Sequence, residues 1–149
     1  MSSSAYTPSI DDLSRALGWY GKLPAAGDFV RRRLSSELVN WWHRWLELGL
    51  PSVKESAAKQ SLFFHAPIWN FALPASHGCD VVQLGCVAPS RDRVGRLYPL
   101  LVSLYVPPSY FEPQLIAGSA RFYQQIGKSL LQAVSCLLYT SDAADDSLR

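Results

Sequence analysis

The sequence predicts an α+β fold, in which a mainly antiparallel five-stranded sheet is covered by helices in the order β-β-α-β-β-β-α. Short apolar runs bounded by proline or glycine are typical of strands, and the chain contains five of them. Two longer segments instead repeat apolar residues at helical spacing. The connections between the last three strands, about 7 to 9 residues each, are too short for parallel crossovers. These three strands are therefore expected to form an antiparallel meander.

A polar segment precedes the first predicted strand. Residues 1–16 are polar and rich in serine, and we expect them to form a flexible leader. Residues 17–23 have the apolar and aromatic content of a strand, which Pro24 ends. Residues 29–33 continue as a second short strand or an extended arm. The chain thus begins with the two strands of the predicted order.

The first long helix is expected to follow these strands. Ser35 and Ser36 are candidate N-caps, because a serine hydroxyl can accept a backbone N–H of the first helical turn. Gly49 and Pro51 occur in the order that ends a helix. Three tryptophans lie on or beside the apolar face: Trp41, Trp42 and Trp45. We interpret them as core residues rather than as a platform for stacking nucleic-acid bases.

The remaining elements complete the sheet and cover it. Three strands are expected at residues 68–73, 81–87 and 97–106, followed by a second long helix at residues 119–134. Residues 52–60 and 111–116 are each compatible with a further helical turn. This order of elements resembles the longin-like arrangement.

Length and composition limit the class of protein. With 149 residues, 48% of them hydrophobic, the chain is long enough for one buried core and too apolar for a disordered protein. No apolar run reaches the ~18 residues of a membrane span, and the N-terminus does not resemble a signal peptide. We therefore expect no insertion into a membrane. Three cysteines without an export signal favour a reducing cytoplasm over a disulfide framework.

The last residues of the chain have an unusual origin. Residues 136–146 read CLLYTSDAADD, which resembles the in-frame translation of a common transposon-based sequencing adapter. We therefore interpret residues 136–149 as a non-native tail and residues 17–135 as a single domain truncated near Ser135. Without the tail, which holds three aspartates and one arginine, the net charge rises from +2 to +4. The alternative is a natural helix that ends in acidic residues.

Residue types that perform catalysis or bind metals occur in this chain, but not at the required spacings. His77, Cys79 and Cys86 fit no common zinc pattern. Ser90 follows a proline in a turn, and the chain has no Gly-x-Ser-x-Gly nucleophile elbow. Two histidines are interpreted as surface or hydrogen-bonded core residues, His43 and His65. We predict no catalytic residue, no metal site and no cofactor.

Arginines are concentrated in two stretches of the chain. They are Arg31, Arg32, Arg33, Arg91, Arg93 and Arg96. The net charge of the whole chain is only modestly positive, so the electrostatic signature of a nucleic-acid binder is weak. We therefore expect no nucleic-acid partner. An anionic patch on a partner protein suits this amount of charge better.

Four turn-rich strings resemble a known family. They are GWYGKLP at residues 18–24, GDFVRR at 27–32, APIWNFAL at 66–73 and PSRDRVGRLYPL at 89–100. Their joint occurrence in this order resembles the TagF/ImpM family of type VI secretion-associated proteins. Ala26 and Asn70 stand where the family pattern leads us to expect arginine, which weakens a role for charge at those two positions.

The resemblance carries expectations about function. It implies a bacterial cytoplasmic accessory protein that represses type VI secretion post-translationally and has no enzymatic activity. It also implies a partner, the forkhead-associated (Fha) scaffold protein of that system. Some family members are fused to a phosphatase domain, and nothing in this chain shows one.

Two loops carry the candidate site. We expect the glycines of the 21–28 and 92–96 segments to bring these loops together, and Asp28 to pair with Arg93 or Arg96. The candidate residues for binding a partner or fixing the loops are Lys22, Asp28, Arg31, Asp92, Arg93 and Arg96. The first reading is a regulator that acts through protein contacts. The alternative is a small hydrolase or a nucleotide- or phosphate-binding module that uses the turn between Lys22 and Asp28, although its glycines and lysine do not have the order of a P-loop.

Overall fold

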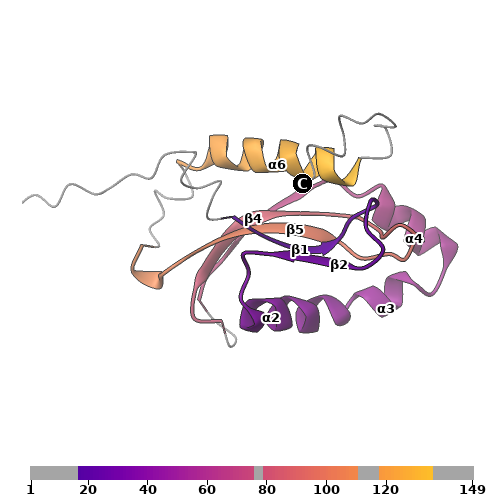
Figure 1. The fold of residues 1–149 in the computed structure, drawn as a ribbon, viewed down its shortest axis with the longest axis horizontal. Helices are drawn as coiled ribbons and strands as arrows, with labels where there is room; N and C mark the ends of the chain where they lie inside the picture. The colour runs from indigo at the N-terminus through magenta and orange to yellow at the C-terminus, as the bar shows by residue number, and fades with distance from the viewer. Residues whose placement is uncertain (1–16, 76–78, 111–117, 136–149) are drawn as a thin grey trace, which may run out of the picture.

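A five-stranded antiparallel sheet forms the centre of the computed structural model, which describes residues 17–75, 79–110 and 118–135. The strands are β1 (Gly18–Lys22), β2 (Phe29–Arg32), β3 (Trp69–Leu73), β4 (Val82–Ala88) and β5 (Leu100–Val106). Their spatial order is β2-β1-β5-β4-β3, so β1 lies inside the sheet and β2 and β3 form its edges. Figure 1 shows the sheet edge-on between layers of helices.

Helices cover both faces of the sheet. In Figure 1, α2 (Ser36–Glu47) and α3 (Leu50–Val53) run beneath the sheet and α6 (Ala120–Val134) runs above it. The short helix α4 (Ala57–Phe64) lies at the end of the sheet where α6 ends. A 3-10 helix, η1 (Pro108–Tyr110), follows β5. Within the part of the chain that the structure describes, no helix is both long and apolar enough to span a bilayer.

Alternation of side chains along β5 divides the core into two halves. Leu100 and Val102 pack on the side of α6, together with Leu130. Leu101 points to the opposite face and packs with Trp42 of α2. The strand is buried on both faces because helices cover both, and each of these large side chains contributes about 1.5–3 kcal/mol of burial free energy.

A buried polar network connects α2 to the middle of the sheet. Gln83 of β4 is fully buried, and its Oε1 accepts hydrogen bonds from Trp42 Nε1 at 2.8 Å and from the Ser103 hydroxyl at 3.1 Å. Its Nε2 donates to the sulfur of Cys79 at 3.5 Å. Burying an amide is costly unless it is hydrogen-bonded, so this network makes the position of α2 on the sheet specific.

The predicted fold class and element order are confirmed. The first long helix begins where its cap predicts, because the Ser35 hydroxyl accepts the backbone N–H of Leu38 at 3.2 Å. The single helical turn expected at residues 52–60 is replaced by two helices, α3 and α4. The turn expected at residues 111–116, the 1–16 leader and the 136–149 tail lie outside the described residues.

The interpretation of the tryptophans needs one correction. Trp42 is buried, with only 2% of its surface exposed, as expected for a core residue. Trp45 is 55% exposed and stacks its ring against Trp41 with an interplanar angle of 3°. The apolar side chains of α2 span a wider part of the helix surface than the face that packs on the sheet, so Trp45 is left partly exposed to solvent.

Candidate functional site

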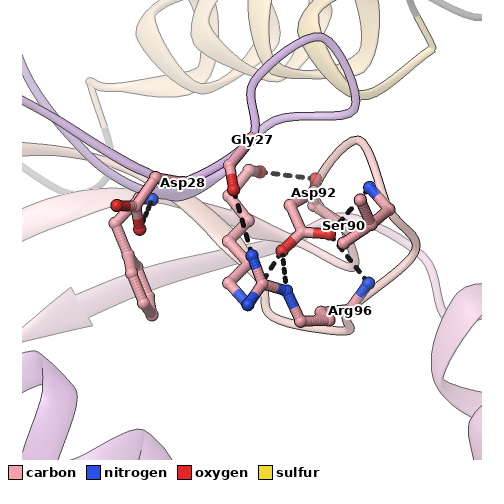
Figure 2. A network of polar contacts seen from close by, with 8 residues as sticks. Gly27, Asp28, Ser90, Asp92 and Arg96 are labelled. Carbon is pink, nitrogen blue, oxygen red and sulfur yellow. Dashed lines mark hydrogen bonds and ion pairs between the residues drawn. The ribbon is translucent and has the colours of Figure 1, made fainter.

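The two loops singled out in the sequence lie side by side, as predicted. The backbone N–H of Arg93 donates to the carbonyl of Ala26 at 2.8 Å, and its guanidinium donates to the carbonyl of Ala25 at 2.9 Å. The Arg96 guanidinium donates to the carbonyl of Gly27 at 3.0 Å, a contact visible in Figure 2. Three contacts therefore hold the 92–96 hairpin against the turn that joins β1 to β2.

A buried carboxylate organises this junction. One oxygen of Asp92, Oδ2, contacts Lys22 Nζ at 3.2 Å and accepts a hydrogen bond from Arg96 Nε at 2.7 Å. The other, Oδ1, accepts the backbone N–H groups of Val94 at 3.1 Å and Arg96 at 2.9 Å. The Asp92 side chain is 0% exposed and that of Lys22 is 10% exposed. We call Lys22, Asp92 and Arg96 the ionic clamp.

The clamp holds Asp92 in its charged form. Burial alone would raise the pKa of this carboxyl, but hydrogen bonds from Arg96 and Lys22 and the charge of Lys22 outweigh that effect and lower the pKa to about 2. Asp92 is therefore ionised at neutral pH and fully occupied by donors. A carboxylate in this state fixes a loop, and it is a weak proton acceptor for general base catalysis.

Close backbone approaches position the clamp lysine. Gly21 has a φ of +137°, and a Cβ there would overlap the Pro99 carbonyl, so glycine lets β1 run tightly against β5. The Lys22 N–H donates to that same Pro99 carbonyl at 3.3 Å, and the Lys22 carbonyl accepts the buried Ser90 hydroxyl at 2.6 Å. Gly95, with a φ of +91°, closes the 92–95 turn.

Aromatic rings surround the clamp on the side of α2. The Lys22 ammonium lies 5.0 Å from the centroid of Phe29 and 6.0 Å from that of Tyr98. The hydroxyls of Tyr20 and Tyr98 are 3.0 Å apart, and each lies within 3.3 Å of His43 Nδ1. Burial raises the pKa of both tyrosines, which keeps their hydroxyls protonated. His43 is thus hydrogen-bonded, in agreement with its interpretation from the sequence.

Three of the six candidate residues lie outside the clamp: Asp28, Arg31 and Arg93, the last of which donates to the two backbone carbonyls described above. Asp28 does not pair with Arg93 or Arg96, so that prediction is wrong. Its carboxylate instead accepts the backbone N–H of the next residue, Phe29, at 2.7 Å, and Figure 2 shows it directed away from Arg96. Arg31 donates its Nε to the carbonyl of Leu34 at 2.9 Å.

The cysteines considered as metal ligands are separated in the fold. Cys79 donates to the carbonyl of Val81 at 3.4 Å, and Cys86 donates to Asn70 Oδ1 at 3.1 Å, on opposite sides of the sheet. His77 lies outside the described residues. Among the residues described, no three His, Cys, Asp or Glu side chains are grouped so that they could hold a metal ion.

A protein-family model matches this chain over residues 18–148. It describes the N-terminal domain of TagF, which is type VI secretion system-associated. The chain belongs to the TagF family. The resemblance found in the four turn-rich strings is thereby confirmed. The match extends into residues 136–148 of this TagF chain, for which an adapter origin stays a prediction.

One solved structure extends the comparison. The crystal structure of PA0076 from Pseudomonas aeruginosa PAO1 is similar to this TagF-family fold, with a TM-score of 0.74 and 34% sequence identity over 78% of this chain. The chain covers 54% of the PA0076 chain, so it spans about half the length of that protein. A search of curated proteins gave no significant match.

Sequence reasoning missed the part that Ser90 plays in this TagF site. The sequence suggests only a nucleophile role to weigh for Ser90, whereas in the structure the residue is 3% exposed and its hydroxyl donates to the Lys22 carbonyl. The Tyr98 N–H donates to the Ser90 carbonyl at 3.1 Å and closes the base of the hairpin, where Pro89 precedes Ser90. Ser90 and Tyr98 both belong to the 89–100 string, and that string was the sequence feature that could have indicated this role.

Proposed function

We propose that this TagF-family domain is a non-enzymatic, cytoplasmic accessory protein of the type VI secretion system. It represses secretion post-translationally by binding a protein partner, and the Fha scaffold of that system is the partner we propose. Family membership supports the association with type VI secretion. The mode of action rests on the state of the ionic clamp.

The observation that carries the proposal is the internal neutralisation of the clamp. The Lys22 ammonium, which a phosphate site would need, contacts the buried Asp92 carboxylate at 3.2 Å and keeps only 10% of its side chain exposed. A phosphate arriving here would have to displace a carboxylate that already accepts four contacts. This favours the first reading, a binding module, over a hydrolase or nucleotide site at the same turn.

Exposed cations around the clamp offer a surface for an anionic partner. Arg31 and Arg93 are exposed, and each guanidinium donates to a backbone carbonyl. Within the described residues, neither forms a salt bridge with a carboxylate, so their charges are not neutralised there. Charge complementarity of this kind speeds association and selects the partner.

The proposal is tested in a type VI-active bacterium that lacks its own TagF. The wild-type chain should reduce release of a type VI effector into the medium and should retain the purified Fha scaffold in a pull-down. A variant with Arg31→Glu and Arg93→Glu should lose both effects while keeping its far-UV circular dichroism spectrum. Arg121→Glu, an exposed charge reversal in the first turn of α6, is the matched control and should behave as wild type.

Other results would redirect the assignment. Repression and Fha binding that survive the double charge reversal would exclude the two arginines from the binding surface. Failure of the wild-type chain to bind Fha would refute the proposed partner. Hydrolysis of p-nitrophenyl phosphate by the wild type, abolished by Lys22→Met, would favour the hydrolase reading instead.

A further inference from the structure

A hollow lined by both apolar and polar groups opens beside the basic loops, between the C-terminal ends of α4 and α6. Its volume is about 510 Å³, within the range of about 300–1,000 Å³ of ligand-binding pockets. Its lining includes Pro24, Phe64, Ile68, Arg91, Leu131 and Val134. We call this hollow the α4–α6 groove. Figure 1 shows α4 and the C-terminal end of α6 at the same end of the sheet.

The groove leaves large apolar side chains in contact with solvent. Leu131 is 53% exposed and Phe64 is 40% exposed, although each is adjacent in sequence to residues that pack into a core cluster. Exposed apolar side chains scattered singly need no explanation, but these two line one concave site. Such a site offers pockets for apolar anchor residues of a partner.

The charges at the groove have one sign. None of the described residues that line it carries a carboxylate, and Arg91 lies among them. Lys128 lies on α6 three residues before Leu131, which places the ammonium on the same side of the helix one turn earlier. Neither cation takes part in a salt bridge within the described residues, where the three salt bridges join other side chains.

The negative ends of the two helices do not cancel this charge. Near the end of α4, the carbonyls of Ser61 and Phe63 accept the backbone N–H groups of His65 and Ala66, both at 3.1 Å. In α6, the carbonyl of Leu131 accepts the N–H of Ser135 at 2.9 Å. These carbonyls are occupied, and a full charge on Arg91 or Lys128 exceeds the partial charge of a helix terminus.

We propose that the α4–α6 groove binds an acidic amphipathic segment of the protein partner, with apolar side chains in the groove and carboxylates facing Arg91 and Lys128. The mode is that of an amphipathic helix lying in a groove. This inference rests on the proposed function, because it presumes a regulator that acts by binding a protein. It locates the contact on a surface different from the exposed face of Arg31.

The test compares three variants in binding assays with the purified Fha scaffold. Leu131→Asp places a carboxylate where we expect the partner's acidic and apolar side chains, and it should weaken binding by at least about tenfold, as for an anchor position. Leu131→Lys removes the same apolar contact but keeps the attraction, so it should weaken binding less. Leu62→Asp is the control, because Leu62 lies on α4, the other helix beside the groove, is 74% exposed and does not line the groove.

The outcomes separate this inference from the proposed function. Fha binding by Leu131→Asp equal to that of Leu62→Asp would overturn the groove inference and leave the partner standing. Absence of Fha binding by the wild-type chain would overturn both. A photo-crosslinker, Leu131→p-benzoylphenylalanine, should attach to an acidic segment of Fha. Attachment to another part of the same chain or to a second copy would identify a different occupant and overturn the proposal.

Discussion

Replacing Gly21 with alanine should destabilise the protein by about 2 to 4 kcal/mol, because two penalties act at the same position. The φ of +137° lies in a region that side-chain-bearing residues rarely adopt, and such a residue costs of order 1–3 kcal/mol. The added Cβ would also overlap the Pro99 carbonyl and come within 2.8 Å of the Leu100 Cα. Relief of that overlap requires β1 and β5 to separate, with loss of at least one hydrogen bond worth about 1 kcal/mol.

Two other glycines provide matched controls. Gly95 has a φ of +91° but no atom within 4 Å of its Cβ position, so alanine there should cost only the backbone strain of about 1–2 kcal/mol. Gly27 also has open space and is not among the positive-φ residues, so alanine should change stability by less than about 0.5 kcal/mol. The three positions thus separate strain from steric overlap.

Thermal unfolding followed by circular dichroism measures the series. For a chain of this length, 1 kcal/mol corresponds to roughly 3 °C in Tm, so Gly21→Ala should lower Tm by roughly 6 to 12 °C and Gly95→Ala by roughly 3 to 6 °C. A Tm for Gly21→Ala within about 2 °C of that for Gly27→Ala would refute the reasoning. It would mean that the β1–β5 contact adjusts without penalty.

Three further predictions concern buried polar groups. Asp92→Asn should destabilise the protein at neutral pH. The difference in free energy of unfolding from wild type should shrink as the pH falls from about 4 towards 2, because the Asp92 carboxyl has a lowered pKa of about 2 and its stabilising contribution is lost on protonation. Urea unfolding at several pH values checks this, and a deficit that is constant down to pH 2.5 would contradict it. Gln83→Leu leaves two donors unsatisfied, the Trp42 indole and the Ser103 hydroxyl, and should lower the free energy of unfolding by about 1–3 kcal/mol for each. In the same denaturation assay, the surface control Leu131→Met should be nearly neutral. Burial raises the pKa of the Cys86 thiol to about 11, so iodoacetamide at pH 8 should label Cys86 in urea but hardly in the native protein, as measured by peptide mass spectrometry. Equal labelling rates in the two conditions would show that β4 opens readily.

The fold was predictable because apolar periodicity reports which faces are buried. Residues 97–106 form an apolar run interrupted by Pro99 and Ser103, and the strand within it, β5, begins after the proline at Leu100 and is covered on both faces. Helix α4 was not predicted, since its sequence AAKQSLFF has no clear apolar face and none of its residues is buried. Such a helix depends on its Ser56 cap and on tertiary contacts that a periodicity argument does not detect.

The meeting of the two loops at the candidate site was predicted correctly, but the predicted pairing of Asp28 with Arg93 or Arg96 was wrong. The positions of glycine and proline indicated that the two loops meet, but charge alone did not decide which carboxylate faces inward. Asp92 starts a turn whose Gly95 N–H donates to its carbonyl at 3.1 Å, and aspartate at that position bonds the backbone N–H groups that follow it. Asp28 bonds the next N–H instead and faces solvent. The Asp-x-x-Gly pattern at 92–95 was the signal that distinguished the two.

The interior position of β1 has a consequence for synthesis on the ribosome. Gly18 pairs with Ser103, so β1 acquires its second neighbour only when β5 has left the exit tunnel. At about 5–20 residues per second, roughly 4 to 17 s pass between the translation of these two residues. Throughout that interval one edge of β1, with its aromatic side chains, is an unpaired template for other chains. Nascent TagF chains should therefore be clients of ribosome-associated chaperones, and slower translation should lower the soluble yield.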